Sequence, residues 1–198
     1  MAMKLNPLIF VPTLFIAPFV LMACGAQPDV AEPSFTANMQ TLCGQAFKGR
    51  LVTDDPEDAE WRDADIKIHM FACTDGDVKI ALHVGEHRSM TWVVSVDAGT
   101  VLLRHDHRQK DGSPHAFTDF GGTADLVSDR RAEFPANPQS IEMFEGFGLP
   151  DAAARKWALE VQAESGIFAY ERARPEHFFR LEFDTKTPIP APPKSWGW

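Results

Sequence analysis

The stretch DIKIHMFACTDGDVKIALHV, residues 65–84, decides the fold expected for this chain. Polar and apolar residues alternate in both of its halves, and the apolar set comprises Ile66, Ile68, Met70, Val78, Ile80, Leu82 and Val84. A period of two places successive side chains on opposite faces of a strand. The halves are separated by Thr-Asp-Gly-Asp at 74–77, and Asp-Gly between alternating segments is a strong hairpin signal. The stretch therefore predicts two antiparallel strands joined by a tight turn.

The same alternation continues along the chain. Further strands are predicted at 89–96, 100–108, 155–162, 167–174 and 178–185, with weaker ones around Arg50 and at 129–134. One helix is expected, because Asn137 can cap it, Pro138 suits its first position and Gly148 can end it. We therefore expect eight or nine strands and one short helix in a single β-domain spanning residues 41–187.

Short strands that follow one another with one apolar face favour a closed or double-layered antiparallel sheet. The predicted fold is an antiparallel meander closing into a barrel similar to those of the lipocalins, with a two-sheet β-sandwich as the alternative. A barrel spanning a membrane is not expected, because the outward faces carry Lys67, Lys79, Arg104 and Arg108.

The first 23 residues have the layout of a secretory signal peptide, with Lys4 near the start, an apolar middle and small residues at the end. Leu21-Met22-Ala23-Cys24 resembles the lipobox of bacterial lipoproteins. The resemblance implies cleavage after Ala23, lipidation of Cys24 and anchoring by several acyl chains. Because Gly25 is not the aspartate of inner-membrane retention, it further implies the outer membrane, facing the periplasm. Residues 24–40 then form a tether, and the proline-rich segment 188–198 forms a tail containing tryptophan.

Cysteine usage agrees with export. With Cys24 assigned to lipid, Cys43 and Cys73 remain, and an even pair in an oxidising compartment predicts one disulfide. Closing a loop of about 30 residues contributes roughly 3 to 4 kcal/mol in the loop-entropy account. The whole chain has a net charge of −9, so nucleic acid is not an expected partner.

The segment LLRHDHRQKDG, residues 102–112, carries the main candidate site. If Leu103 faces the interior, His105 and His107 continue the same face where the strand leaves the core. We therefore predict a ligand site that involves Trp92, Arg104, His105, His107 and Arg108. The alternative is a polar cluster at a barrel mouth, with Asp106 paired to neighbouring arginines.

The same pair of histidines also suits metal chemistry, because alternate imidazoles on one strand can share a zinc or another divalent metal ion. Gly99 followed by His105-Asp106-His107 resembles the opening of the first cupin motif. The chain departs from that motif at Asp111 or Gly112, where a glutamate is expected, and the second cupin motif is missing. A third ligand would have to come from a residue such as His83, His87, His115 or Asp119.

Other motifs support little chemistry. His83-Val84-Gly85-Glu86-His87 matches the H-x-x-E-H pattern of inverted zinc peptidases, but the alternating flanks predict a turn between strands instead of the required helix. The sequence contains no nucleophile elbow, H-E-x-x-H, C-x-x-C, Walker or Rossmann motif. His83-Val84-Gly85, Arg88-Ser89, Thr91-Trp92 and 103–108 resemble exported proteobacterial proteins without an established activity.

These observations favour a lipid-anchored periplasmic protein that binds a small molecule or envelope component, without a cofactor and without enzymatic activity. Two alternatives stay open. One is a metal-dependent enzyme that uses His105 and His107, and the other is an envelope assembly or interaction module that uses the acidic surface or the tail.

Overall fold

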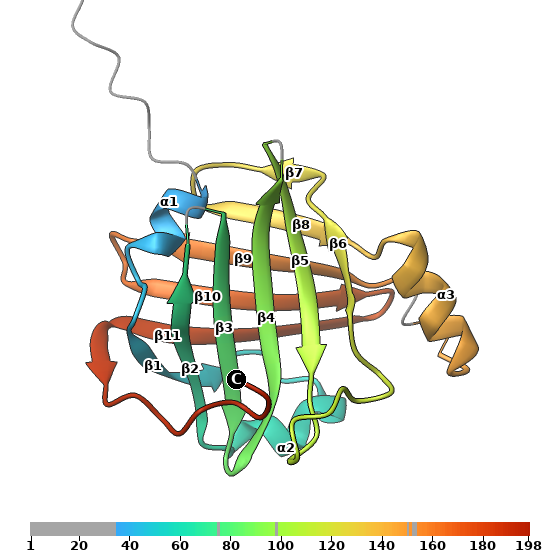
Figure 1. Cartoon of the computed structure of the whole chain (residues 1–198), viewed down its shortest axis with the longest axis horizontal. Coiled ribbons are helices and arrows are strands. Elements are labelled where there is room, and N and C mark those ends of the chain that lie inside the picture. The colour runs from blue at the N-terminus through green and yellow to red at the C-terminus, as the bar shows by residue number, and fades with distance from the viewer. Residues whose placement is uncertain (1–34, 75, 98, 150, 152–153) are drawn as a thin grey trace, which may run out of the picture. The chain divides into compact units, whose positions relative to one another are not determined.

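The hairpin predicted at residues 65–84 is present in the computed structural model, which describes residues 35–198 apart from 75, 98, 150 and 152–153 (Figure 1). Strand β2 (Ile66–Cys73) pairs antiparallel with β3 (Asp77–Val84). The alternate side chains Ile68 and Met70 are fully buried on one face. The local pattern therefore determines which side chains enter the core.

The described chain contains eleven strands, two more than the larger estimate from the sequence. The others are β1 (Ala46–Leu51), β4 (His87–Asp97), β5 (Thr100–His107), β6 (Phe120–Thr123), β7 (Leu126–Val127), β8 (Arg131–Pro135), β9 (Lys156–Gln162), β10 (Ile167–Arg174) and β11 (His177–Ile189). The extra elements are short pieces such as β6 and β7, which offer too few residues to show a period of two.

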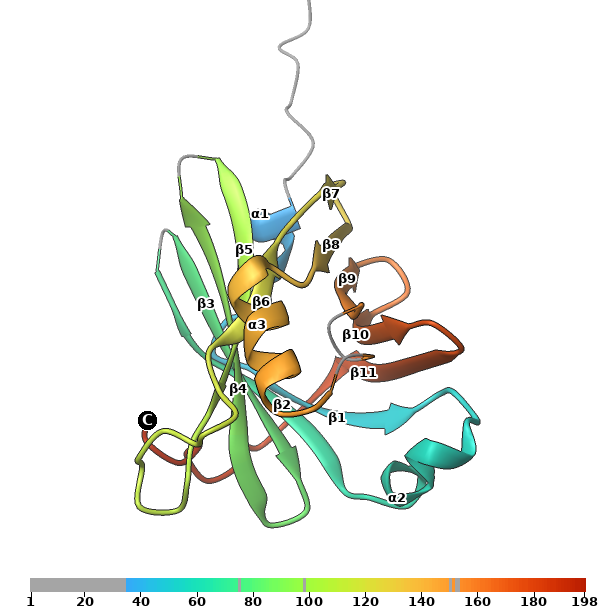
Figure 2. The same cartoon turned by 90° about the vertical axis from the view of Figure 1, so that its right-hand side faces the viewer.

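All strands belong to one antiparallel sheet in the order β6-β5-β4-β3-β2-β1-β11-β10-β9-β8-β7. Each strand pairs with its neighbour in sequence, except that β1 pairs with β11 and β6 does not pair with β7. The wall formed by β2–β5 crosses the wall formed by β8–β11 (Figures 1 and 2). The predicted antiparallel meander in a nearly closed, barrel-like sheet is confirmed.

Glycines allow the two walls to approach at the unpaired seam. A Cβ atom on Gly122 of β6 would lie 1.8 Å from the carbonyl oxygen of Pro135 in β8, so this backbone contact requires glycine. The N–H of Asn137 donates to the carbonyl oxygen of Gly121 at 3.0 Å. Ser140 Oγ accepts from Gly121 N–H at 2.7 Å and donates to Gly121 O at 2.9 Å. The chain after β8 is thereby fastened to β6.

Ser140 lies in α3 (Pro138–Gly146), which is the predicted helix. Its cap is as expected, because Asn137 Oδ1 accepts from the Ser140 N–H at 2.8 Å. The structure also contains α1 (Phe35–Gln40), the 3₁₀ turn η1 (Pro56–Asp58) and α2 (Ala59–Arg62), which the sequence pattern did not indicate. These helices are shorter than two turns, so their apolar spacing is too brief to stand out.

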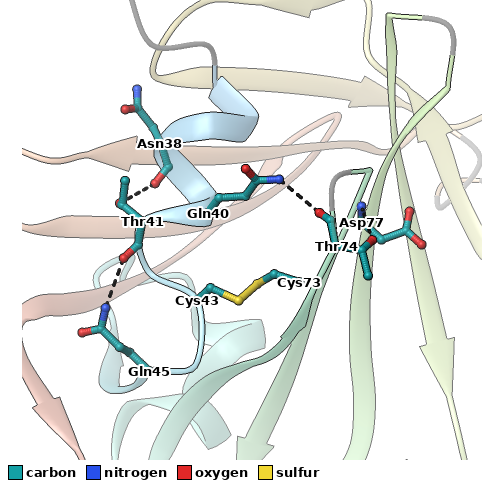
Figure 3. Close-up of a disulfide and its surroundings, with 8 residues drawn as sticks. All are labelled: Asn38, Gln40, Thr41, Cys43, Gln45, Cys73, Thr74 and Asp77. Carbon is teal, nitrogen blue, oxygen red and sulfur yellow. Dashed lines mark hydrogen bonds between the residues drawn. A yellow bond between two sulfur atoms is a disulfide. The ribbon is translucent and has the colours of Figure 1, made fainter.

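The predicted disulfide is confirmed. Cys43, which follows α1, is joined to Cys73 at the end of β2, with 6.2 Å between the Cα atoms (Figure 3). Beside it, the Gln40 side-chain amide donates to the carbonyl oxygen of Thr74 at 3.1 Å. Residues 35–40 belong to the segment assigned to the tether, yet Phe35 of α1 is buried in the core.

The C-terminal segment folds back over the outer face of β2–β4. Trp196 packs against His87 with ring centroids 5.1 Å apart, and Trp198 packs against Phe71 at 5.8 Å and under the Lys79 ammonium at 4.2 Å. The last strand extends to Ile189, so it includes the first two residues of the predicted tail.

Residues 35–198 belong to one compact unit. Within this part of the chain, no helix combines the length and apolar character needed to cross a membrane. The signal peptide predicted at 1–23, the lipidated Cys24 and the first part of the tether lie outside the described residues.

Candidate binding cavity inside the barrel

A cavity of about 110 Å³ lies inside the barrel, between the two crossing walls. Strands β4 and β5 contribute Trp92, His105 and His107 to its lining, and strand β10 contributes Tyr170. These side chains reach the interior because each shares the parity of the apolar residues before it in the strand. Three of the five predicted ligand-binding residues therefore meet at one cavity.

His105 is 2% exposed and lines the cavity. Its Nδ1 lies 3.2 Å from the carbonyl oxygen of Phe120, and its Nε2 lies 3.0 Å from the hydroxyl of Tyr170. A carbonyl can only accept, so Nδ1 carries the proton and Nε2 of the neutral ring accepts from Tyr170. Burial lowers the pKa of His105 well below its ordinary value, and His107 lowers it further. His105 is therefore neutral near pH 7.

Aromatic rings fix this histidine. The ring of Phe120 stacks on His105 with centroids 4.6 Å apart, and Trp157 approaches it at 5.0 Å. Trp92 and Tyr170, which come from opposite walls, stack at 4.1 Å. The cavity is consequently formed mainly by flat apolar surfaces around the buried hydrogen-bond chain from Phe120 O through His105 to Tyr170.

His107 is half-buried and contacts the edge of Phe120, with ring centroids 5.2 Å apart. Burial lowers its pKa to about 4, and His115 lowers it as well, whereas Asp106 raises it. Its backbone N–H donates to Thr118 Oγ1 at 2.7 Å, which holds the end of β5 against the following loop. Near pH 7 this imidazole is also neutral.

Two arginines, which the sequence interpretation did not select, complete the lining. Arg155 immediately precedes β9, and Arg172 lies in β10 two residues after Tyr170. Burial lowers the pKa of Arg155 to about 10, and the nearby Arg172 lowers it further. A parity signal existed, because each arginine continues an apolar stripe that includes Trp157 or Phe168.

The charges of the two arginines are balanced differently. Arg172 Nη2 lies 3.4 Å from Asp58 Oδ1, and Asp58 Oδ2 lies 2.9 Å from His177 Nε2. For Arg155, the described residues provide no ion pair. All of the lining residues lie in the described part of the chain, and none of them is acidic.

Of the other two predicted binding residues, Arg104 lies on the opposite face of β5 and Arg108 directly follows the end of that strand. Arg104 is exposed and pairs with Asp119 at 3.5 Å. Arg108 donates to both carboxylate oxygens of Asp106, at 2.7 and 3.1 Å, and this pairing raises the pKa of Arg108. Both arginines therefore pair with carboxylates, and neither is among the lining residues of the cavity.

The two histidines predicted as metal ligands both face the cavity, but both ring nitrogens of His105 already have protein partners. Among the residues whose positions are described, no group of three or more His, Cys, Asp or Glu side chains is placed to hold a metal ion. The H-x-x-E-H match is a turn as predicted, because β3 ends at Val84 and β4 begins at His87.

Larger hollows occur on the surface. One of about 580 Å³ lies at the bulge between β1 and β11, where few of the lining residues are buried and Arg50 Nη2 lies 3.7 Å from Glu182 Oε2. Another of about 370 Å³ shares Trp61 and Met90 with the interior cavity and so extends its mouth. The smaller interior cavity is the better candidate for a binding site, because it would surround a small molecule on several sides and its polar groups converge on one space.

Comparisons with protein-family models, with curated proteins and with solved structures give no significant match. The residues of the cavity and the sequence features of the N-terminal segment are therefore the features that indicate a function.

Proposed function

We propose that this chain is a lipid-anchored protein of the cell envelope, held at the outer membrane and facing the periplasm, whose barrel binds a small molecule. The observation that carries the proposal is the interior cavity. It is concave, lined by aromatic rings and supplied with a few polar groups that converge on one space.

The cavity is suited to binding because its walls are already in place. Trp92, Tyr170 and Phe120 are buried and held by ring stacking, so little ordering is required when a ligand enters. Trp61, Met90 and His107 are half-buried at its edge, which gives a ligand a route from the surface. A preformed apolar space with a partly open mouth is typical of ligand-binding barrels.

Export and anchoring are supported by the lipobox at 21–24 and by the disulfide between Cys43 and Cys73, a type of bond that persists in oxidising compartments. An N-terminal lipid would keep the barrel at a membrane surface, close to molecules that pass through the envelope.

Binding is tested with a library of neutral and charged fragments, using thermal shift and ligand-observed NMR on the protein without a tag. Met90→Trp should fill the mouth and abolish binding, while Val52→Trp, at an exposed site, should not. If no fragment binds, or if Met90→Trp leaves the affinity of the bound fragments unchanged, the cavity is not a ligand site.

Anchoring is tested separately by fractionating cells and measuring the mass of the N-terminal peptide. We expect the protein in the outer-membrane fraction with an acylated Cys24. The variant Cys24→Ser should lack the acyl chains and should no longer be found in the outer-membrane fraction. An unacylated protein in the soluble cytosol would contradict this part of the proposal.

A further inference from the structure

The charges around the cavity do not balance. Two guanidinium groups border it, the two imidazoles are neutral near pH 7, and no lining residue carries a carboxylate. Asp58 balances Arg172 at 3.4 Å, which leaves Arg155 without a counter-charge among the described residues. We propose that the ligand supplies this counter-charge, and that the cavity binds the carboxylate of a small organic acid through Arg155. This inference rests on the proposed small-molecule binding and specifies its chemical class.

The hydrogen-bonding state of the arginines supports the same reading. The Nε atoms of Arg155 and Arg172 are buried, and neither has a hydrogen-bond acceptor in the part of the chain that the structure describes. A buried donor without an acceptor is costly, so an anion that accepts from it would gain more than one bound at the surface.

Aromatic rings hold both guanidinium groups in place. The Arg155 guanidinium carbon lies 5.8 Å from the centroid of Phe144, and that of Arg172 lies 4.6 Å from the centroid of Phe179. A guanidinium packed against a ring leaves the N–H donors in its plane available, and that fork matches the two oxygens of a carboxylate.

The size of the cavity limits the ligand. A volume of about 110 Å³ is well below the roughly 300 to 1,000 Å³ of pockets that hold drug-sized ligands. A carboxylate with a short apolar stem fits this space, with the stem against the aromatic rings of the lining. The acid can be a free short-chain acid or the carboxylate end of a longer molecule that continues over Trp61 and Met90.

The test compares butyrate with butyramide, which has a similar shape but no charge, by following the tryptophan indole resonances during NMR titrations of the full domain. We expect butyrate to bind and butyramide to bind at least roughly tenfold more weakly, because hydrogen bonds to charged groups are the stronger ones. Octanoate distinguishes the two sources, since tighter binding than butyrate favours a longer acid and weaker binding favours a short one.

Variants assign the effect to a residue. Arg155→Gln should weaken butyrate binding at least roughly tenfold and leave butyramide unchanged, whereas Arg155→Lys should recover part of the loss. Arg104→Gln is the matched control, because Arg104 is exposed on the outer face. Circular dichroism and the melting temperature establish that each variant is folded.

The possible failures are distinct. If butyramide binds as well as butyrate, or if Arg155→Gln leaves butyrate binding unchanged, the carboxylate inference is wrong while small-molecule binding stands. Tighter binding of inorganic phosphate than of butyrate would also overturn the inference. If neither these probes nor the fragment library bind, the proposed function fails as well.

Discussion

Arginines stand in two opposite settings on the two faces of the β8–β11 wall. On the outer face, Arg131 bonds Glu171 at 2.6 Å and Arg180 bonds Glu160 at 2.8 Å, with Arg180 also bonded to Glu171. On the inner face, Arg155 borders the cavity without an acidic neighbour among the lining residues. The outer arginines are thus paired with carboxylates, as is Arg172 with Asp58 at the cavity, whereas Arg155 has no such partner among the described residues.

This difference distinguishes charged residues that support the fold from those that are candidates for ligand binding. A fold can tolerate buried or half-buried ions that are fully paired. Removing one partner lowers the stability, because the other ion is then left as an uncompensated charge. A half-buried cation that lacks a partner lowers stability in the absence of ligand, and such groups mark candidate functional sites. The outer network is therefore expected to respond to mutation through stability, and the inner arginine through binding.

The largest effect is expected from breaking the outer network. Glu171→Ala removes a carboxylate that is 6% exposed and leaves Arg131 and Arg180 with fewer partners. We expect a loss of about 3 kcal/mol in the free energy of unfolding, measured by urea denaturation. Glu164→Ala, at an exposed turn position, should change it by less than about 0.5 kcal/mol. Equal stability of the two variants would remove the structural role of the network.

A smaller loss is expected inside the barrel. Tyr170→Phe deletes the hydroxyl that donates to His105 Nε2 and leaves that nitrogen buried without a partner, which costs about 2 kcal/mol. Adding His105→Phe should recover part of this loss, because both polar groups are then replaced. Urea denaturation of the two single variants and the double variant measures the coupling. Strict additivity would mean that the hydrogen bond contributes nothing.

The third prediction concerns pH. Because burial lowers the folded-state pKa of His105, the unfolded chain binds a proton below about pH 6.5 that the folded chain does not. Stability must then fall as pH decreases from 6.5 toward the folded-state pKa. Between pH 6.5 and 5.5 this one group costs about 1 kcal/mol.

His105→Asn should remove that part of the pH dependence, while His87→Asn, at an exposed position, should not. The measurement is urea denaturation of the three proteins at both pH values. The same pH slope in wild type and His105→Asn would show that His105 protonates equally in the folded and unfolded states.

The smallest expected effect has the opposite sign. Arg155→Met removes a desolvated cation and keeps most of the side-chain volume, so the free domain should gain up to about 1 kcal/mol in the free energy of unfolding. Arg104→Met on the exposed outer face should give no comparable gain. Urea denaturation checks both values, and a clear loss of stability in Arg155→Met would show that this arginine has a structural partner.

Local signals predicted much of the fold. The alternation at 65–84 and the Asp-Gly turn gave β2 and β3, and the capping residue Asn137 gave α3, because backbone geometry fixes these patterns over a few residues. The helices α1 and α2 and the strands β6 and β7 were missed, since each is too short to repeat its own period.

The candidate site was predicted in part for the same reason. Parity along β5 pointed His105 and His107 inward, and the structure places both at the cavity. Parity also placed Arg104 and Arg108 outward, yet they were selected for their closeness in sequence to the histidines, and they lie away from it. The same alternation of side chains along a strand predicts that Arg155, Tyr170 and Arg172 of the other wall point inward. It does not predict that they face His105.

The sequence by itself determined the alternating strands, the tight turns, the helix cap and the cysteine pair, because these depend on neighbours within a few residues or on simple composition. Only the tertiary structure decided that β11 returns to pair with β1 and that β5 faces β10 across the interior. Contacts between distant segments arise when the sheet curls and buries both walls together. No period within one strand specifies which residue of another strand will lie opposite it.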